Sequence, residues 1–263
     1  MAERPRALIT GAARRLGRAM ALDLAGSGWD VAIHFHRSRE AADETAADAR
    51  ALGAKTATLR ADLLAEDETG ALVSRAADAL GGPLSLLINN ASLFENDHLE
   101  SSTREQWDRA IGTNLRAPVR LTQEFAAQAP DAATDSGGEP VSRAFVINML
   151  DQRIWKPSPD FMSYSLAKSA LYAFTQTAAQ ALAPRVRVNA IGPGPTLQGD
   201  RESSGHFARQ RRACILGRGS DPEDIVAAMR FILACKALTG QMIAVDGGQH
   251  LVWQTPDITG IGS

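Results

Sequence analysis

The sequence has little cysteine, no long apolar stretch and almost no net charge. Only two cysteines, Cys214 and Cys235, occur among its 263 residues. That is too few for a disulfide framework, and we expect both to pack as small buried side chains. No segment approaches the roughly 18 consecutive apolar residues of a membrane-spanning helix. The formal net charge of −2 gives no reason to expect nucleic acid or an acidic membrane as a partner.

The amino-terminal segment leaves no room for a signal peptide. Residues 1–6 run directly into the apolar segment Ala7, Leu8 and Ile9, whereas a secretory signal has a charged segment and then a longer apolar one. We therefore expect a cytoplasmic protein. A chain of this length suits one large α/β domain or two small ones, and it buries about three quarters of its unfolded surface without disulfides or metals.

Short apolar segments alternate with longer amphipathic ones along the chain. Most of the short segments are rich in Val, Ile and Leu without polar alternation, as is typical of parallel strands covered on both faces. They are residues 7–10, 30–35, 56–60, 84–89, 144–148, 185–190 and 242–245. The helical patterns are residues 16–26, 40–52, 66–80, 103–128, 164–183 and 221–234. This alternation predicts one α/β domain over residues 1–263, a Rossmann-type doubly wound parallel sheet of about seven strands flanked by helices.

Local signals predict where several helices begin and end. Ser102 and Glu105 have the spacing of a capping box. Asp221 followed by Pro222 has the pattern of an N-cap with proline at the first helical position. Gly53 follows the last residue of the second predicted helix, where a glycine often ends a helix.

Three segments are predicted to lack regular structure. Residues 130–140 have a turn-forming composition, which predicts a surface loop that is mobile. Residues 192–219 follow a strand end and are predicted to be irregular or short-helical, in the place of a lid over a substrate. Residues 251–263, with Trp253, are expected either to reach a neighbouring subunit or to form a mobile terminus.

A glycine turn between the first predicted strand and helix indicates a dinucleotide site. Gly11 permits a tight turn, and the helix that begins near Leu16 presents free N–H groups to a pyrophosphate. Arg14 adds a positive charge from the turn.

The second predicted strand is followed by His36, Arg37 and Ser38. An NAD-dependent enzyme tends to place an acidic residue near this point, where it binds the ribose 2′-hydroxyl. Arg37 and Ser38 instead offer a cation and a hydroxyl, which suit a 2′-phosphate. The sequence therefore predicts NADPH as the cofactor.

Polar residues follow two further strand ends. Asp62 and Leu63 follow the third predicted strand, where an adenine ring would lie, and Asn90, Ala91 and Ser92 follow the fourth, next to the cofactor ribose. Asn and Asp also favour ordinary turns. Their placement at successive strand ends nevertheless favours a role in cofactor binding.

Tyr164 and Lys168 lie four residues apart in a predicted helix, so their side chains share one face. Tyrosine at its usual pKa of about 10 is a poor acid–base catalyst at neutral pH. A nearby ammonium favours the phenolate and lowers that pKa. Lysine is rare in this chain, which has it elsewhere only at positions 55, 156 and 236. We therefore predict that Tyr164 and Lys168 handle proton transfer.

Several segments, in this order, resemble the short-chain dehydrogenases/reductases over essentially the whole chain. They are residues 11–17, Asn89-Asn90-Ala91, Asn114, Tyr164 with Lys168, Gly192-Pro193-Gly194 and Val245-Asp246-Gly247-Gly248. The resemblance implies that Tyr164 donates a proton, that Lys168 lowers the tyrosine pKa and holds the nicotinamide ribose, and that Asn114 supports a water-linked proton path. It also implies cofactor binding near Gly194 and a homotetramer built partly through the predicted helices 103–128 and 164–183.

Two positions depart from the family's usual pattern. Arg15 stands where the glycine turn usually has another glycine, and Asp151 stands where the catalytic serine is usual. Both departures recur in the pteridine reductases and the related dihydromonapterin reductases, which the chain also resembles at residues 34–38, 89–94 and 148–151. That branch implies that Phe94 stacks the pterin ring against the nicotinamide. It further implies that Arg15 and Ser92 hydrogen-bond the pterin and the cofactor phosphate, and that Asp151 works beside Tyr164 in donating a proton.

Three functions follow from these patterns. The first is NADPH-dependent reduction of a pterin, such as dihydromonapterin, dihydrobiopterin or dihydrofolate, to its tetrahydro form. The second is reduction of an ordinary carbonyl substrate, which the missing serine disfavours. The third is a catalytically silent NADP(H)-binding regulator, which the intact Tyr164–Lys168 pair disfavours. No metal site is predicted, and the expected partners are a small pterin substrate and further copies of the chain.

Overall fold

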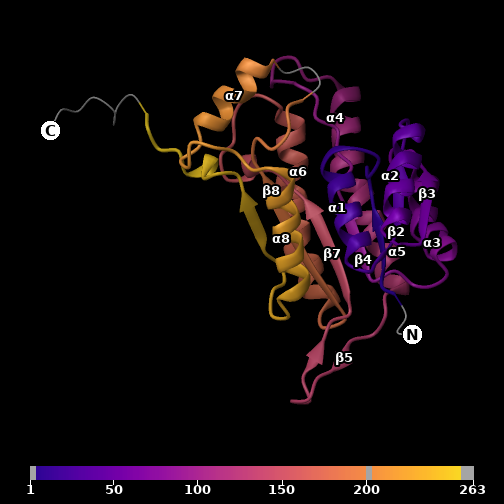
Figure 1. The fold of residues 1–263 in the computed structure, drawn as a ribbon. Helices are drawn as coiled ribbons and strands as arrows, with labels where there is room; N and C mark the ends of the chain where they lie inside the picture. The colour runs from indigo at the N-terminus through magenta and orange to yellow at the C-terminus, as the bar shows by residue number, and fades with distance from the viewer. Residues whose placement is uncertain (1–3, 200–202, 256–263) are drawn as a thin grey trace.

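The apolar segments form one parallel sheet, and the amphipathic segments cover both of its faces (Figure 1). The computed structural model describes residues 4–199 and 203–255. The sheet has seven strands in the order β3-β2-β1-β4-β7-β8-β9, which are β1 (Arg6–Ile9), β2 (Asp30–Phe35), β3 (Thr56–Arg60), β4 (Leu86–Asn89), β7 (Ala144–Met149), β8 (Val186–Pro193) and β9 (Met242–Val245). The predicted doubly wound α/β fold is confirmed.

Alternate residues of each strand face two separate apolar layers. In β1, Ala7 and Ile9 join the buried cluster that also contains Met20, whereas Leu8 joins the cluster that contains Phe125. Helices α1 (Arg15–Gly26), α2 (Arg39–Ala51) and α8 (Pro222–Ala234) cover the first face, and α3 (Glu66–Leu80), α5 (Ala117–Gln128) and α6 (Met162–Leu182) cover the second. Burial on both faces explains why the strands read as continuous apolar runs.

The strand order reverses direction beside β1. The chain passes from β1 outward to β2 and β3, and then returns to β4 on the other side of β1. Ligands of open α/β sheets bind outside the carboxyl ends of the strands at such a switch point. The predicted site residues lie in the loops that follow the strands at this edge and at the starts of the helices after them, apart from Asn114 in the middle of a helix.

The predicted helix over residues 103–128 is one helix with a change of winding in its middle. It consists of α4 (Arg104–Ile111), the π-helical turn η1 (Gly112–Arg116) and α5. Its capping box is formed by Thr103 and Gln106, so the prediction of Ser102 and Glu105 is wrong by one residue. Both pairs fit the same spacing rule, and only the backbone geometry separates them. The predicted N-cap Asp221 of α8 is confirmed.

The segment over residues 130–140 is more regular than predicted. It contains the antiparallel hairpin β5 (Ala133–Thr134) and β6 (Pro140–Val141), and Asp135 closes the turn by accepting hydrogen bonds from the N–H groups of Gly137 and Glu139. Figure 1 shows this hairpin projecting from the end of the molecule opposite α7 (Ser204–Arg212) and α4. It therefore takes no part in the site at the carboxyl ends of the strands.

The remaining predictions concern the carboxyl-terminal third of the chain. Helix α7 lies within the segment 192–219, which was predicted to be irregular or short-helical. The short helices η2 (Gln152–Ile154) and η3 (Gln249–Leu251) follow β7 and β9. The predicted tail extends beyond the described residues, and Trp253 within them is exposed.

Among residues 4–199 and 203–255, the structure contains no helix with the length and apolar character to cross a membrane.

Candidate active site

The turn between β1 and α1 brings the backbone close to the end of β4. Gly11 has a φ of +62°, and a Cβ at this residue would lie 3.0 Å from the Cα of Ala91. A Cβ on Gly17 would lie 2.4 Å from the carbonyl oxygen of Gly11. Arg15 also has a positive φ, +56°, a conformation that glycine adopts most readily. Helix α1 has no side-chain cap, so its first N–H groups are available to an anion.

The imidazole of His34 holds this turn in place, a role that we did not predict. Nδ1 of the buried His34 accepts a hydrogen bond of 3.1 Å from the Gly11 N–H. The ring proton must then reside on Nε2, which lies 3.1 Å from the carbonyl oxygen of Ala61. Burial lowers the pKa of His34 to about 4. The uncharged ring therefore links the ends of β1, β2 and β3.

We expect His34 to make the folded state sensitive to acid. Its pKa is lower in the folded state than the 6.5 of the unfolded chain, so its contribution to stability is complete above pH 6.5 and is lost as the pH falls to about 4. Two to three pKa units correspond to about 3 kcal/mol of unfolding free energy. Urea unfolding at pH 7 and pH 4 measures this loss.

The matched control for this acid sensitivity is His34→Gln, which cannot be protonated in this range. Protonation of carboxylates destabilises both proteins in acid. The difference between their losses of unfolding free energy therefore isolates the contribution of the imidazole. Wild type should lose about 3 kcal/mol more than the variant between pH 7 and pH 4. An equal loss in both proteins would contradict this role of His34.

Two arginines stand free at the nucleotide end of the site. Arg14 and Arg37 are exposed, and within residues 4–199 and 203–255 neither guanidinium has a hydrogen-bond or ion-pair partner. Ser38 is the N-cap residue of α2, next to Arg37, and its hydroxyl makes no capping bond. Within the described chain, the cations and the hydroxyl predicted to bind a 2′-phosphate are therefore not committed to other groups.

The residues predicted to surround the adenine meet at neighbouring strand ends. His36 Nε2 lies 3.6 Å from Asp62 Oδ2, and Asp62 Oδ1 accepts the N–H of Leu64 at 3.0 Å. The side chain of Leu63 packs against the buried cluster that includes α3. The Leu63 side chain is only partly buried there, and its contact with adenine stays a prediction.

Asn90 and Ala91 tie the end of β4 to the glycine turn. Asn90 Nδ2 donates to the carbonyl oxygens of Thr10 and Gly11, at 2.8 and 3.1 Å. The backbone N–H groups of Asn90 and Ala91 both donate to Thr10 Oγ1, at 2.9 and 3.0 Å. These bonds place both residues beside the turn, where we predicted them, and they show that the Asn90 amide also builds the turn itself.

Asn114 lies fully buried within the π-helical turn η1. Its Oδ1 accepts hydrogen bonds from Ser92 Oγ at 2.7 Å and from the Leu93 N–H at 3.1 Å, and its Nδ2 donates to the Leu93 carbonyl at 3.0 Å. Single π turns within α-helices occur frequently at functional sites. The predicted residues Asn114 and Ser92 are thus brought into direct contact.

Tyr164, Asp151 and Lys168 meet where β7 ends and α6 begins. The Tyr164 hydroxyl donates to Asp151 Oδ2 at 2.9 Å. The ammonium of Lys168 donates to the Met149 carbonyl at 2.7 Å and lies 5.7 Å from the centroid of the Tyr164 ring. Tyr164 and Lys168 are both buried. The structure therefore joins the three predicted catalytic side chains in one cluster.

The pKa of Tyr164 is shifted in the direction opposite to the prediction, since it is raised and not lowered. Burial and the adjacent Asp151 carboxylate raise the pKa of Tyr164 well above 10, whereas Arg153 and Ser92 oppose this rise more weakly. The predicted lowering by Lys168 is not among the causes of this shift, and burial lowers the pKa of Lys168 itself to about 8. Burial also raises the pKa of Asp151. Tyr164 consequently keeps its proton at neutral pH and can act as a donor.

Phe94 belongs to an aromatic cluster with Phe161 and Tyr164. Phe94 and Tyr164 were predicted as site residues, and Phe161 was not. The Phe94 ring stacks on Phe161 with centroids 4.1 Å apart and an angle of 7° between the planes, and it meets Tyr164 edge to face at 4.8 Å. About half of Phe94 is exposed. A half-exposed apolar ring thus lies next to the Tyr164 ring, and such a ring can stack a flat heterocycle.

Phe161 is held in an unusual backbone conformation by the loop after β4. Its φ is +57°, which is rare for a bulky residue. The Asn96 side chain accepts the Phe161 N–H at 3.3 Å, and the buried Asp97 carboxylate accepts the Ser163 N–H at 3.1 Å. No local sequence signal predicts a positive φ for phenylalanine, and the tertiary contacts of Asn96 and Asp97 maintain it.

Arg15 reaches across the site to the segment after β8. Its guanidinium donates to the carbonyl oxygens of Gln198 and Leu197, at 2.7 and 3.0 Å. We predicted that Arg15 binds a pterin or a phosphate. The guanidinium N–H groups that do not take part in these two bonds remain available for such a contact. Gly194 begins this segment, and it is packed so closely that a Cβ there would lie 2.6 Å from the Cβ of Asp246.

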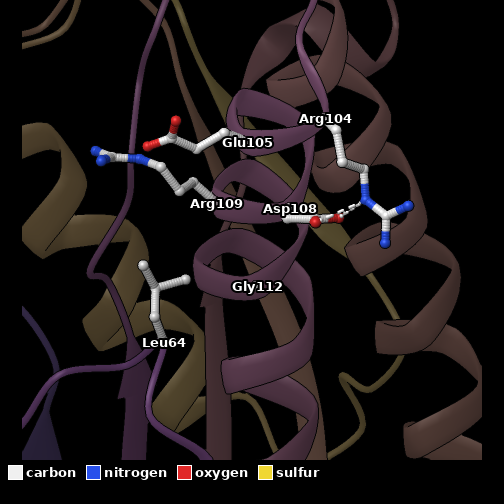
Figure 2. A pocket seen from close by; sticks show the side chains of 6 residues that line it. All are labelled: Leu64, Arg104, Glu105, Asp108, Arg109 and Gly112. Carbon is white, nitrogen blue, oxygen red and sulfur yellow. Dashed lines mark hydrogen bonds and ion pairs between the residues drawn. The ribbon is translucent and has the colours of Figure 1, made fainter.

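A separate hollow on the surface lies along α4 and contains none of the predicted site residues. It is lined by Leu64, Arg104, Glu105, Asp108, Arg109 and Gly112 (Figure 2). Arg104 pairs with Asp108 at 2.7 Å, and Arg109 pairs with Glu95 at 2.7 Å. Three of the four charged residues that line the hollow are thus paired, and none of the residues predicted for catalysis lies there.

The chain is similar to known proteins over nearly its whole length. The family model described as short chain dehydrogenase matches residues 5–205. A 3-oxoacyl-acyl-carrier-protein reductase, FabG, of Staphylococcus aureus is 29% identical over 250 residues, which cover 93% of this chain and 98% of that protein. An uncharacterized oxidoreductase of Mycobacterium tuberculosis is 36% identical over 249 residues, covering 92% of this chain and 90% of that protein.

Among solved structures, one similar protein is the FolM alternative dihydrofolate reductase 1 of Brucella suis, crystallised in complex with NADP. It is 42% identical, with a TM-score of 0.89, and the match covers 97% of this chain and 98% of that chain. The corresponding protein of Brucella canis, also with NADP, matches at the same identity and TM-score. A short chain dehydrogenase of Burkholderia cenocepacia in complex with NADP is 28% identical, with a TM-score of 0.82, covering 93% and 97% of the two chains.

Proposed function

The chain belongs to the short-chain dehydrogenase/reductase family, and from this premise we propose that it uses NADPH to reduce a dihydropterin to the tetrahydro form. The observation that carries the proposal is the 2.9 Å hydrogen bond between the Tyr164 hydroxyl and the Asp151 carboxylate. The 42% identity to the Brucella proteins named as dihydrofolate reductases supports it. Dihydrofolate contains a dihydropterin ring, so the proposed substrates include it.

A carboxyl group beside the tyrosine suits reduction of a C=N bond better than reduction of a ketone. Such a reduction requires a hydride at carbon and a proton at nitrogen. Asp151 has a raised pKa because it is desolvated, so it can take up a proton and deliver it to the nitrogen or to Tyr164. The serine usual at this position has no proton to exchange near neutral pH, whereas a carboxyl group does.

The residues present fit NADPH. The uncapped start of α1 and the close approach of Gly11 to Ala91 provide a backbone cradle for a pyrophosphate. The exposed and unengaged guanidinium groups of Arg14 and Arg37 suit a 2′-phosphate. When bound, the cofactor supplies the hydride.

The chain's own residues then position the substrate and move the proton. Phe94 offers an apolar ring for stacking of the pterin, and the Tyr164 ring meets it at a steep angle, with centroids 4.8 Å apart. Lys168 anchors the first turns of α6 to the end of β7 through the Met149 carbonyl, which keeps the Tyr164 hydroxyl in place. Asn114 orients Ser92 beside the same site.

We expect Arg37→Ala to weaken the preference for NADPH over NADH. A charge-assisted hydrogen bond to a phosphate contributes about 1.5–3 kcal/mol, and the lower end applies because Arg37 is exposed. The KM for NADPH should rise about tenfold, whereas the KM for NADH should change little because NADH has no 2′-phosphate. Arg39→Ala, which removes the next exposed arginine, serves as the control. An unchanged ratio of the two KM values in Arg37→Ala would contradict this role.

A panel of substrates tests the proposed function. Purified protein is mixed with NADPH and, separately, with dihydromonapterin, dihydrobiopterin, dihydrofolate and simple ketones, and the absorbance of NADPH is followed. We expect oxidation of NADPH with at least one of the three pterins and little with the ketones. Binding of NADPH without oxidation by any pterin would disprove the proposal.

Reduction of a carbonyl substrate is the second candidate function. It is favoured by the similarity to proteins named 3-oxoacyl-acyl-carrier-protein reductases, at 26–30% identity. The carboxyl group of Asp151 in place of a serine argues against it. Turnover of a 3-oxoacyl thioester that exceeds turnover of every pterin would favour this second function. A homotetramer remains a proposal, and light scattering of the purified protein would test it.

A further inference from the structure

Arg153 is a cation at the active site that the proposed reaction does not use. It lies in η2, two residues after Asp151, and its backbone N–H donates to Asp151 Oδ1 at 2.9 Å. The other oxygen of Asp151 accepts the Tyr164 hydroxyl. Both carboxyl oxygens are therefore engaged without the Arg153 guanidinium, which points elsewhere.

The guanidinium of Arg153 lies against the aromatic cluster. Its central carbon is 5.0 Å from the centroid of Phe161 and 5.8 Å from that of Phe94. Nη1 donates to the Ser158 hydroxyl at 2.8 Å, which holds the group in one orientation. The side chain is half-buried. A positive charge is thus fixed next to the ring face on which the substrate is proposed to stack.

The Arg153 charge acts on the nearby Asp151 carboxyl group, whose pKa it lowers, without forming an ion pair with it. No carboxylate within residues 4–199 and 203–255 forms an ion pair with Arg153. Asp160, on the same loop, pairs instead with His98 at 3.3 Å. A guanidinium has five N–H donors, and Ser158 accepts from one of the nitrogens that carry them. The remaining donors can bind a planar, two-oxygen group such as a carboxylate.

We propose that Arg153 determines substrate specificity by binding the carboxylate of an acidic substituent on the dihydropterin. The inference rests on the proposed function and refines it. Stacked on aromatic rings, a guanidinium keeps its edge free for bidentate hydrogen bonds to a carboxylate. Dihydropterins that carry an acidic substituent, as dihydrofolate does, therefore bind better than those with a neutral hydroxylated side chain, such as dihydrobiopterin.

A purely structural role for Arg153 leads to a different expectation. If the guanidinium only supports the stacked rings of Phe94 and Phe161, its removal weakens binding of every dihydropterin to the same extent, because all of them share the ring. If it binds a carboxylate, its removal weakens binding of the acidic substrate alone. Comparison of one acidic and one neutral substrate therefore separates the two roles.

The test compares KM and kcat for dihydrofolate and dihydrobiopterin in wild type, Arg153→Met and Arg153→Lys. Methionine keeps a long apolar side chain against the rings but removes the charge, and lysine keeps the charge without the planar fork. In Arg153→Met we expect the KM for dihydrofolate to rise about tenfold or more, the KM for dihydrobiopterin to change less than about threefold, and Arg153→Lys to lie between. Arg104→Met, which alters an exposed arginine of α4, should leave both KM values unchanged.

The outcomes distinguish this inference from the proposed function. Equal increases of KM for both substrates, or no increase for either, would overturn the role of Arg153 and leave pterin reduction intact. Wild-type turnover of dihydrobiopterin with no turnover of dihydrofolate would do the same. Wild-type protein that oxidises NADPH with neither substrate would overturn both proposals.

Discussion

Tyr164→Phe should lower kcat for dihydropterin reduction by about 10²–10⁴-fold, the range that a positioned proton donor contributes. This substitution removes only the hydroxyl group that donates to Asp151, and the ring keeps its edge-to-face contact with Phe94. Because the pKa of Tyr164 is raised by burial and by Asp151, the wild-type hydroxyl is protonated and ready to donate at neutral pH. Steady-state oxidation of NADPH measures the loss.

The chain contains a natural control for this substitution. Its only other tyrosine, Tyr172, lies on the same helix but packs against the cluster around Leu171. Tyr172→Phe should leave kcat within about twofold of wild type, since it removes no group of the site. NADPH binding, followed by fluorescence, should persist in both variants. A Tyr164→Phe protein that keeps more than a tenth of the wild-type kcat would exclude Tyr164 as the main proton donor.

Asp151→Asn should lower kcat for dihydropterins by about 10²-fold, at the low end of the range for general acid catalysis, because Tyr164 retains its proton. The amide still accepts the Tyr164 hydroxyl but cannot be protonated near neutral pH. Asp151→Ser restores the hydroxyl usual in the family, and we expect it to reduce ketones faster than wild type does.

The pH dependence of kcat should also change in Asp151→Asn. Burial raises the pKa of Asp151, and only the protonated carboxyl group donates, so the wild-type rate should fall as the pH rises through that pKa. Asp151→Asn should lack this decrease. A second decrease should occur in wild type near the Lys168 pKa of about 8. It should move to lower pH in Asp151→Asn, because the Asp151 charge raises the Lys168 pKa.

Asp160→Asn is the matched control for Asp151, since Asp160 is an exposed acid on the same loop that pairs with His98. We expect it to keep the wild-type pH profile. The assignment of Asp151 as a proton donor would be excluded by a pH profile of kcat that is the same in Asp151→Asn and in wild type.

Most of the fold and the main site residues could be predicted from the sequence. The strands were found because burial on both faces demands continuous apolar runs, such as Asp30–Phe35. Tyr164 and Lys168 were predicted from their spacing on one helix face, and Asp151 was predicted from the resemblance to a family that usually has a serine at its position. The structure adds that all three are in one cluster, with a hydroxyl–carboxyl bond of 2.9 Å.

The features that were missed depend on contacts between distant segments. The raised pKa of Tyr164 results from its burial and from Asp151, neither of which the spacing of Tyr164 and Lys168 reveals. The positive φ of Phe161 exists only because Asn96 and Asp97 hold its neighbours. Arg15 appeared to be only a phosphate or pterin ligand, because its contact with Leu197 and Gln198 spans more than 180 positions.

His34 gives the protein an internal reporter of local opening. Because Gly11 donates to Nδ1, the imidazole proton sits on Nε2, buried against the Ala61 carbonyl. A proton so enclosed exchanges with solvent only when the ends of the neighbouring strands separate transiently. The exchange rate of this single side-chain proton therefore measures how often the nucleotide end of the sheet opens, without any added label.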